Sequence, residues 1–197
     1  MPKLKLTKNE LKKQKDSLQR FSKYLPMLQL KKQQLQFEIL RIKREMEIKQ
    51  NNLDSLLHQV DEWVDLFSEG LKIEDWFKVE NVITENRNIA GVDIAVFKDI
   101  KFKEHGYDLY TTPLWVDKGI EALREAARLK SEQALLIRQI EVLSQELSIT
   151  SQRVNLFEKV KIPQSKDNIR RIKIFLGDIF TAEVVRGKIA KSKLSQN

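Results

Sequence analysis

The sequence contains no cysteine, so it has neither a disulfide framework nor a thiolate metal site, which fits a reducing compartment. Glycine and proline are also scarce, at six and four of 197 residues, which is typical of long regular elements. No run of eighteen apolar residues occurs, so we expect no insertion into a membrane. The first residues, MPKLKLTKNE, lack the apolar core of a secretion signal, and we expect no secretion.

Motifs that carry catalysis or cofactor binding are missing as well. The patterns G-x-x-x-x-G-K-[ST], G-x-G-x-x-G and G-x-S-x-G do not occur. The two histidines, His58 and His105, are far apart without metal-ligand spacing, and we interpret them as surface residues. The adjacent carboxylates at 61–62 and 74–75 are interpreted as solvated charged faces. We therefore expect no catalytic residue, no cofactor and no metal site.

What the chain has instead is an apolar repeat over residues 18–67, whose positions step alternately by three and four. Thirteen of its fifteen positions hold an apolar residue, and the exceptions are Lys32 and Lys49. A repeat sustained over seven heptads predicts a helix that supercoils against a partner helix. At about 1.5 Å per residue this helix would be about 75 Å long.

A second repeat of the same kind covers residues 122–157 and supplies that partner. A non-helical segment separates the two repeats, so the two helices would run antiparallel. The segment Ile162-Pro163 interrupts the second repeat, which restarts one residue late at Ile169 and Ile172. A phase slip beside a proline indicates local bending or rewinding of the coil. The basic residues 188–197 are expected to fray.

The stretch between the repeats has β-branched residues in partial alternation, which predicts a β-hairpin around residues 79–97. Residues 86–88 (Asn-Arg-Asn) and Gly91 would supply its turn. The predicted fold is mainly α: a long antiparallel two-helix coiled coil with a small β-hairpin head between the helices. Its segments would be the first long helix (1–70), the hairpin and loop head (71–112) and the second long helix (113–197).

Helix boundaries are indicated by local signals. Thr7 followed by Glu10 is a capping box, which predicts that the first helix starts near Lys8. Pro26 would bend this helix without ending it, because the repeat keeps its phase there. Gly70 is the expected stop, with one further turn at residues 73–77. The second helix is expected to begin at Pro113, with Thr112 as its cap.

The net charge is +8, and basic residues gather near both ends of the chain. In an antiparallel pair these two groups would meet at one tip, which would suit an acidic partner. The alternative is a solvated, frayed end. The candidate tip residues are Lys8, Lys12, Lys13, Lys15, Arg186, Lys188 and Lys191.

Two sets of apolar residues lie off the seams of the predicted coil. They are either scattered surface residues and a broad core edge, or stripes on which other subunits dock. The first stripe is Met27, Leu30, Phe37, Leu40 and Ile48, and the second is Leu135, Val142, Ile149 and Leu156.

Residues 150–163 carry the most specific pattern in the chain. They resemble the T-x-x-R-V-N-x-x-E-x-x-x-I-P signature of the D subunits of V-type and archaeal A-type ATPases. The run L-x-x-K in residues 28–35 and the segment N-x-x-G-V at residues 88–92 resemble the same family. Tyr24-Leu25-Pro26 stands where the family usually has a glycine, and residues 177–183 replace its acidic-basic run. The signature matches are Arg153, Val154, Asn155, Glu158, Ile162 and Pro163.

The resemblance implies a non-catalytic central rotor shaft that couples ATP turnover in an A–B hexamer to rotation of a membrane ring and to H⁺ or Na⁺ transport. It implies paired termini inside the hexamer, with the F subunit of the central stalk and the socket subunit of the ring bound at the other end. The chain would be cytoplasmic and peripheral to the membrane.

Two alternatives remain beside the rotor shaft. A basic coiled-coil nucleic-acid-binding protein is disfavoured, because aromatic residues are not interleaved with the basic groups. A tether between membrane proteins would not need a β head. We therefore expect no nucleic-acid partner.

Overall fold

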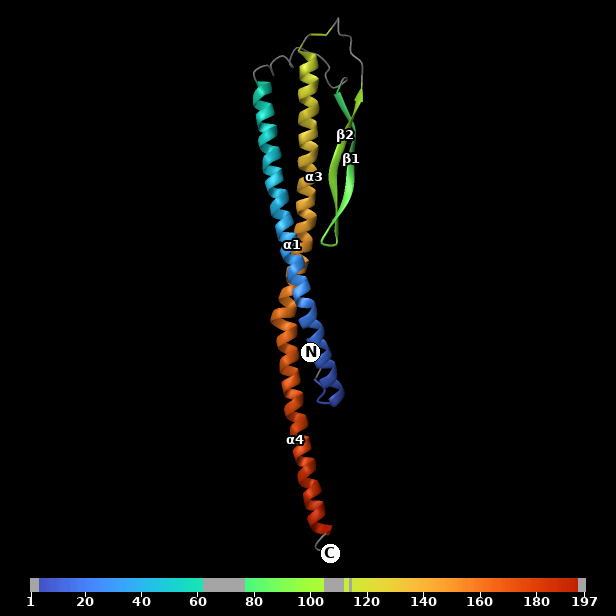
Figure 1. The fold of residues 1–197 in the computed structure, drawn as a ribbon, viewed down its shortest axis with the longest axis vertical. Helices are drawn as coiled ribbons and strands as arrows, with labels where there is room; N and C mark the ends of the chain where they lie inside the picture. Colours follow the sequence, from blue (N-terminus) through green and yellow to red (C-terminus); the bar gives the residue numbers. More distant parts are fainter. Residues whose placement is uncertain (1–3, 62–76, 105–111, 114, 195–197) are drawn as a thin grey trace. The chain divides into compact units, whose positions relative to one another are not determined.

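The structure is a computed structural model that describes residues 4–61, 77–104, 112–113 and 115–194 (Figure 1). Its helices are α1 (Lys8–Asp61), α3 (Val116–Asn155) and α4 (Ile162–Leu194), with a π-helical turn η2 (Leu156–Lys161) between the last two. Its strands are β1 (Phe77–Ile89) and β2 (Val92–Glu104). The chain divides into an end unit (Met1–Lys32 with Ile149–Asn197) and a middle unit (Gln33–Ser148), which are described in turn.

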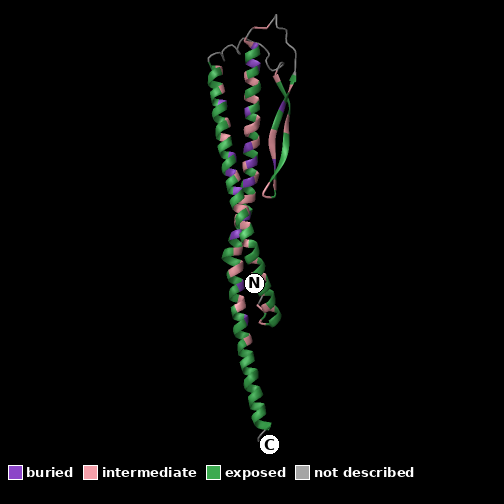
Figure 2. Cartoon of the chain, in the orientation of Figure 1, coloured by how far each residue is buried: buried purple, intermediate pink, exposed green. Residues whose placement is uncertain are grey.

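The mainly α fold with a hairpin between the helices is confirmed, and the first repeat is the buried side of α1. Every seam position from Leu18 to Val60 is buried or half-buried, while most positions between them are exposed (Figure 2). The last two, Trp63 and Phe67, lie outside the described residues, as does the expected stop at Gly70. The buried members are Leu35, Ile39, Ile42 and Leu53.

The start of α1 follows the predicted cap. The Glu10 backbone N–H donates to Thr7 Oγ1 over 3.3 Å, and the helix begins at Lys8. The Glu10 carboxylate contacts the next turn of the helix, where its Oε1 accepts a hydrogen bond from Gln14 Nε2 at 2.9 Å. Pro26 lies inside the helix and does not end it.

In the middle unit, α1, α3 and the hairpin share one core. Its buried members are Leu35, Ile39 and Ile42 from α1, Ile94 from β2, and Leu136 and Leu143 from α3. The ion pair of Lys49 with Glu132 and the 2.9 Å bond from Gln133 Nε2 to Gln50 Oε1 show that α1 and α3 are neighbours here. Because Ile94 contributes to the core, the hairpin is packed along the helices of this unit (Figure 1).

The hairpin is longer than predicted, since its strands cover residues 77–104 rather than 79–97. Its turn is only two residues, Ala90 and Gly91. Both have positive φ, 51° and 79°, as the tight turns that join antiparallel strands require. The interpretation of residues 86–88 as a turn is wrong, since they belong to β1 and pair with β2. Asn88 still stabilises the turn from the end of the strand. Its Oδ1 accepts from the Gly91 N–H at 3.0 Å, and its Nδ2 donates to Asp93 at 2.6 Å.

Helix α3 begins later than expected. Pro113 precedes the helix, and its carbonyl accepts a hydrogen bond from the Val116 N–H at 3.1 Å. Trp115 then accepts from the Gly119 N–H at 2.9 Å. The prediction that Pro113 is the first helical residue is therefore wrong, because a turn closed by its carbonyl comes first.

In the end unit, the first part of α1 packs against α3, η2 and α4. The rings of Phe21 and Phe157 are 5.0 Å apart, and Asn168 Nδ2 donates to Gln14 Oε1 over 3.4 Å. Gln14 comes before Phe21 in α1, whereas its partner Asn168 comes after Phe157 in the second helix. The two helices are therefore antiparallel. The most buried side chains of the second helix are Thr150, Val154, Ser165 and Ile172.

The predicted phase slip near Pro163 coincides with η2. In this turn the Ile162 N–H donates to the Phe157 carbonyl, five residues earlier rather than four. A π-helical turn holds one residue more than an α-helical turn, which accounts for a seam that restarts one residue late. The prediction that residues 188–197 fray is wrong for the described part, because α4 is helical through Leu194.

Candidate interaction surfaces

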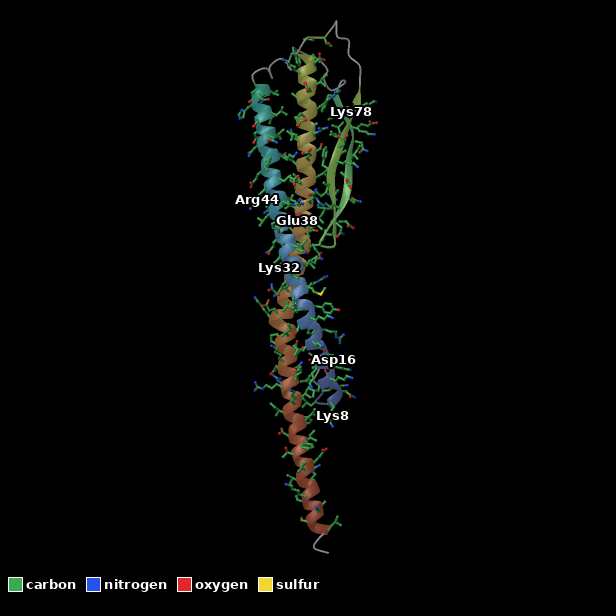
Figure 3. The ribbon with its side chains drawn as sticks, in the orientation of Figure 1. Lys8, Asp16, Lys32, Glu38, Arg44 and Lys78 are labelled. Carbon is green, nitrogen blue, oxygen red and sulfur yellow. The ribbon has the colours of Figure 1, made fainter. Side chains whose placement is uncertain are left out.

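The two basic groups do not meet. Gln14 of α1 contacts Asn168 of α4, which puts Lys8 beside a residue near 174 of the antiparallel helix. Arg186 then lies about 18 Å further along α4, at about 1.5 Å per residue. Figure 3 shows Lys8 at the start of α1 and α4 continuing past it. The prediction of one shared basic tip is therefore wrong. All seven of the predicted tip residues are exposed.

The last part of α4 is a single exposed helix with apolar residues on all sides. Every residue from 177 to 194 is exposed. Phe175, Phe180 and Val185 are five residues apart, so each points about 140° from the one before. Exposed apolar residues in this number are typical of a surface that another protein covers. The exposed apolar residues, between 39 and 67% exposed, are Ile174, Phe175, Ile179, Phe180, Val184, Val185 and Ile189.

The first predicted stripe lies on the outer side of α1. Its members are between 56 and 67% exposed, although the seam residues beside them are buried or half-buried. Met27 and Leu30 belong to the end unit, and Phe37, Leu40 and Ile48 to the middle unit. Its role in docking stays a prediction.

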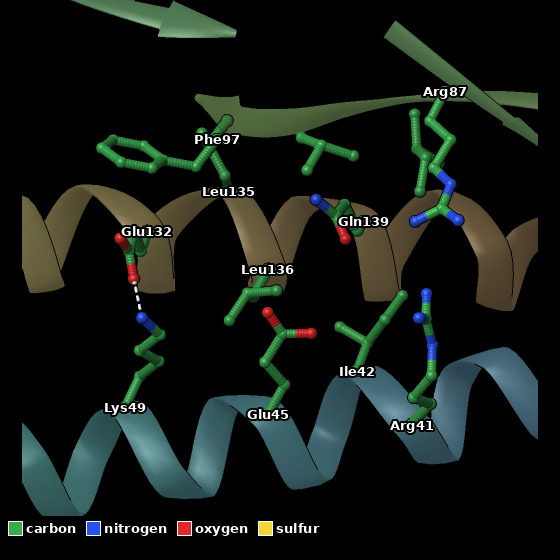
Figure 4. Close-up of a pocket in the computed structure, with 12 residues that line it drawn as sticks. Arg41, Ile42, Glu45, Lys49, Arg87, Phe97, Glu132, Leu135, Leu136 and Gln139 are labelled. Carbon is green, nitrogen blue, oxygen red and sulfur yellow. Dashed lines mark ion pairs between the residues drawn. The ribbon is translucent and has the colours of Figure 1, made fainter. Parts of the chain in front are cut away.

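The second stripe divides at the hairpin. Leu135 and Val142 are half-buried and line cavities whose walls include residues of β2. Figure 4 shows Leu135 beside Phe97 of β2. Ile149 and Leu156 are 41% and 42% exposed. The hairpin of the same chain therefore lies against the first half of this stripe, and the second half is open.

A layer of polar side chains runs through the middle unit beside its apolar core. It surrounds a cavity of about 260 Å³ and joins α1 to α3 and the hairpin (Figure 4). Lys49, one of the two seam exceptions, pairs with Glu132 of α3, and the two side chains are 30% and 15% exposed. Gln139 is 6% exposed, and its Nε2 donates to the Ala95 carbonyl of β2 at 2.6 Å. Sequence reasoning missed Gln139, because a lone glutamine on a charged helix carries no signal of burial.

Two further contacts hold the hairpin on α3. Arg128 Nη2 lies 3.4 Å from Asp99 Oδ1, and the Arg124 guanidinium lies 5.8 Å from the centre of the Phe102 ring. The Arg128 and Asp99 side chains are about half exposed, so their attraction contributes little to stability. Together with Gln139 they position the strand rather than create a binding cavity.

Catalytic chemistry is not brought together by the part of the chain that the structure describes. No group of three histidine, aspartate or glutamate side chains that could hold a metal occurs among residues 4–61, 77–104 and 115–194. His58 is 84% exposed, with its Nδ1 3.6 Å from Asp61, and His105 lies outside the described residues. Within the same ranges, no helix is long and apolar enough to cross a membrane.

The signature residues of the predicted family surround η2. Val154 is buried in the seam, Ile162 is half-buried, and Pro163 follows the turn directly. The polar members Arg153, Asn155 and Glu158 are exposed. The signature therefore marks an irregular turn in a long helix.

Antiparallel helix pairs and a docked hairpin define a mainly α, coiled-coil protein with an exposed terminal helix. Comparison with known proteins gives the family. The family of ATP synthase D subunits matches residues 10–192, and the chain belongs to this family. The signature in residues 150–163 indicated the same family.

Similar proteins cover nearly the whole chain. The V-type ATP synthase D subunit of Borreliella burgdorferi is 52% identical over 194 residues, 98% of this chain and 96% of that protein. The protein of the same name from Chlamydia abortus is 35% identical over 98% of this chain and 94% of its own length. That from Chlamydia muridarum is 32% identical over 98% and 97%.

Proposed function

We propose that this chain is the non-catalytic central rotor shaft of a V-type ATPase or ATP synthase. It would couple ATP turnover in the A–B hexamer to rotation of the membrane ring and to H⁺ or Na⁺ transport. Membership of the family of ATP synthase D subunits supports this function over the nucleic-acid-binding and tethering alternatives. In this function the chain is cytoplasmic and attached to the membrane through the complex.

The observation that carries the proposal is the exposed terminal part of α4. Seven apolar side chains point from it in all directions. In water their apolar surface stays exposed, which is unfavourable, so a protein partner that covers them would stabilise the helix. A sleeve of protein around the helix would cover all of these sides at once. The inner channel of a hexamer is such a sleeve.

The basic residues of α4 suit a helix that turns inside this sleeve. Arg186, Lys188 and Lys191 are exposed, and exposed ion pairs are worth about 0–1 kcal/mol each. Such residues can exchange acidic partners at little energetic cost as the helix turns. The N-terminal group, with Lys8 and Lys15, lies further back along the pair and would face the mouth of the sleeve.

The remaining exposed surfaces suit partners that would rotate together with this chain. We assign the stripe on α1 and the open residues Ile149 and Leu156 to contacts with the F subunit of the central stalk. The end of α1 beyond Leu57 and the start of α3 would be nearest to the socket subunit of the membrane ring.

The proposal is tested by reconstitution. Purified A–B hexamer is assayed for ATP turnover alone, with the F subunit alone, and with this chain and the F subunit together. We expect the complete set to form a stable complex with a changed turnover rate. The same turnover with and without the chain would contradict the rotor-shaft function.

A further inference from the structure

The irregular turn η2 lies at the place where the seam of the second helix changes phase. The backbone on both sides is regular, with φ and ψ of −60° and −41° at Asn155 and −67° and −51° at Ile162. The bond from the Ile162 N–H to the Phe157 carbonyl spans five residues. The helix is therefore unbroken and contains one residue more than an α-helix would hold at this point.

The extra residue decides which side of α4 faces α1. Ile172 is 0% exposed in the helix pair, and its neighbour Arg171 is 68% exposed. If the same residues formed an α-helical turn in place of η2, every later residue would be rotated about the helix axis by one residue position. That rotation is about 100°. Arg171 would then take the buried place of Ile172, and Gln164 that of Ser165.

Pro163 provides a physical reason why the turn stays open. It has no N–H, so it cannot donate to the Lys159 carbonyl four residues earlier. Its ring would also clash with that carbonyl in a regular helix. A wider turn over residues 156–161 avoids the clash, because its hydrogen bonds reach five residues back.

We propose that Pro163 is a positioning residue that fixes the rotational phase of α4 by keeping η2 open. The proline sits on the exposed side and does not contribute to the core itself. Its effect is transmitted through the turn to Ser165 and Ile172, which are 5% and 0% exposed in the helix pair. The same phase sets the directions of Phe175, Phe180 and Arg186 on the exposed part of the helix.

The test uses the absence of cysteine from the chain. Single cysteines are introduced in the full-length protein, as Ile172→Cys and as Arg171→Cys, and their rates of reaction with a maleimide are measured. With Pro163 present, Cys at 172 should react slowly and Cys at 171 rapidly. In the Pro163→Ala background the two rates should converge or reverse. Removal of an interior proline shifts such an equilibrium by up to about a hundredfold. Unchanged rates at both positions would overturn the proposal.

Deletion of Val160 is the matched control. It removes the extra residue, so a regular helix returns Ile172 to the side that faces α1. The deletion combined with Pro163→Ala should therefore show the protected 172 and reactive 171 of the parent chain. If this double variant reacts like Pro163→Ala alone, the phase is not set by the residue count in η2, and the proposal is wrong. Circular dichroism spectra confirm that each variant is helical.

A second readout rests on the proposed function. In a reconstituted complex, Pro163→Ala should lower the ATP turnover that depends on this chain, and adding the Val160 deletion should restore it. If the chain has no effect on turnover, the rotor function fails while the maleimide result still decides the phase. If turnover responds to the chain but not to Pro163→Ala, the phase of α4 has no role in coupling.

Discussion

Gln139 is a polar side chain in a buried position of the middle unit, where its amide bonds the Ala95 carbonyl of β2. In Gln139→Ala this carbonyl would lose its partner, which typically costs about 1–3 kcal/mol. We expect the free energy of unfolding, measured by urea titration with circular dichroism, to fall by this amount. The control is Gln133→Ala, whose bond to Gln50 is exposed, and which should cost less than about 0.5 kcal/mol. Equal losses would show that Gln139 does not hold the hairpin.

Phe37 is 67% exposed on the outer side of α1. In Phe37→Asp we expect the isolated chain to keep its helical content, because the side chain is not in the core. Binding to the F subunit, measured by calorimetry, should weaken by at least about tenfold if the ring is a contact residue. The adjacent, exposed Gln36→Asp carries the same charge change and should bind normally. Loss of helicity in Phe37→Asp would instead assign the ring to the core.

At the residue scale, the sequence predicts what depends on local spacing. The seam residues follow from the periodicity of the apolar residues. The Thr7 cap follows from the spacing of three residues between Thr7 and Glu10. Gln139 and the pairing of Lys49 with Glu132 depend on where β2 and α3 come to lie. Nothing local to these side chains marks them, so they could not be predicted.

Among the elements, α1 and α4 of the end unit are separated in part by a polar layer. Gln14 and Asn168 occupy facing positions, and a groove beside them is lined by Ser17, Gln164 and Ser165. Replacing both partners of a hydrogen bond by apolar groups is often neutral or stabilising. We therefore expect Gln14→Leu with Asn168→Leu to raise the urea midpoint.

Each single substitution should instead lower the midpoint. Gln14→Leu leaves Asn168 Nδ2 without its acceptor, and Asn168→Leu leaves Gln14 Oε1 without its donor. Hydrogen exchange at residues 8–20 gives an independent readout, since tighter pairing would slow it in the double variant. A double variant less stable than either single one would show that the polar pair is needed for the helices to associate.

Element boundaries were predicted less well than element types, and each error has a physical cause. The hairpin turn contains Ala90 at positive φ, a conformation that sequence rules assign to glycine or asparagine. Ala90 is accepted there because it packs against the core of the middle unit. Residues 188–194 are rich in lysine, which suggests fraying, yet lysine and alanine are good helix formers.

For the whole molecule, the predicted antiparallel pairing is confirmed, but the shared basic tip is not. The length by which α4 continues past α1 depends on the register between the helices, and no local pattern encodes it. The sequence could therefore indicate the family of ATP synthase D subunits through its signature, without showing that α4 ends as a single helix.

Truncation separates the terminal part of α4 from the rest of the chain. Removing residues 178–197 leaves Ile172 and the buried seam intact, so the truncated chain should fold and bind the F subunit normally. It should lose its effect on ATP turnover by the hexamer, because the exposed apolar helix is missing. Removing only residues 195–197 is the control. Full activity of the long truncation would show that the exposed helix does not engage the hexamer.

The most direct test of the rotor shaft is to watch it turn. The exposed Ser55 is replaced by cysteine in this cysteine-free chain, and a bead is attached there in a complex whose A–B hexamer is fixed to a surface. On addition of ATP, the rotor-shaft function predicts continuous rotation of the bead in one direction, stopping when ATP is removed. A bead that stays still while the hexamer hydrolyses ATP would contradict it.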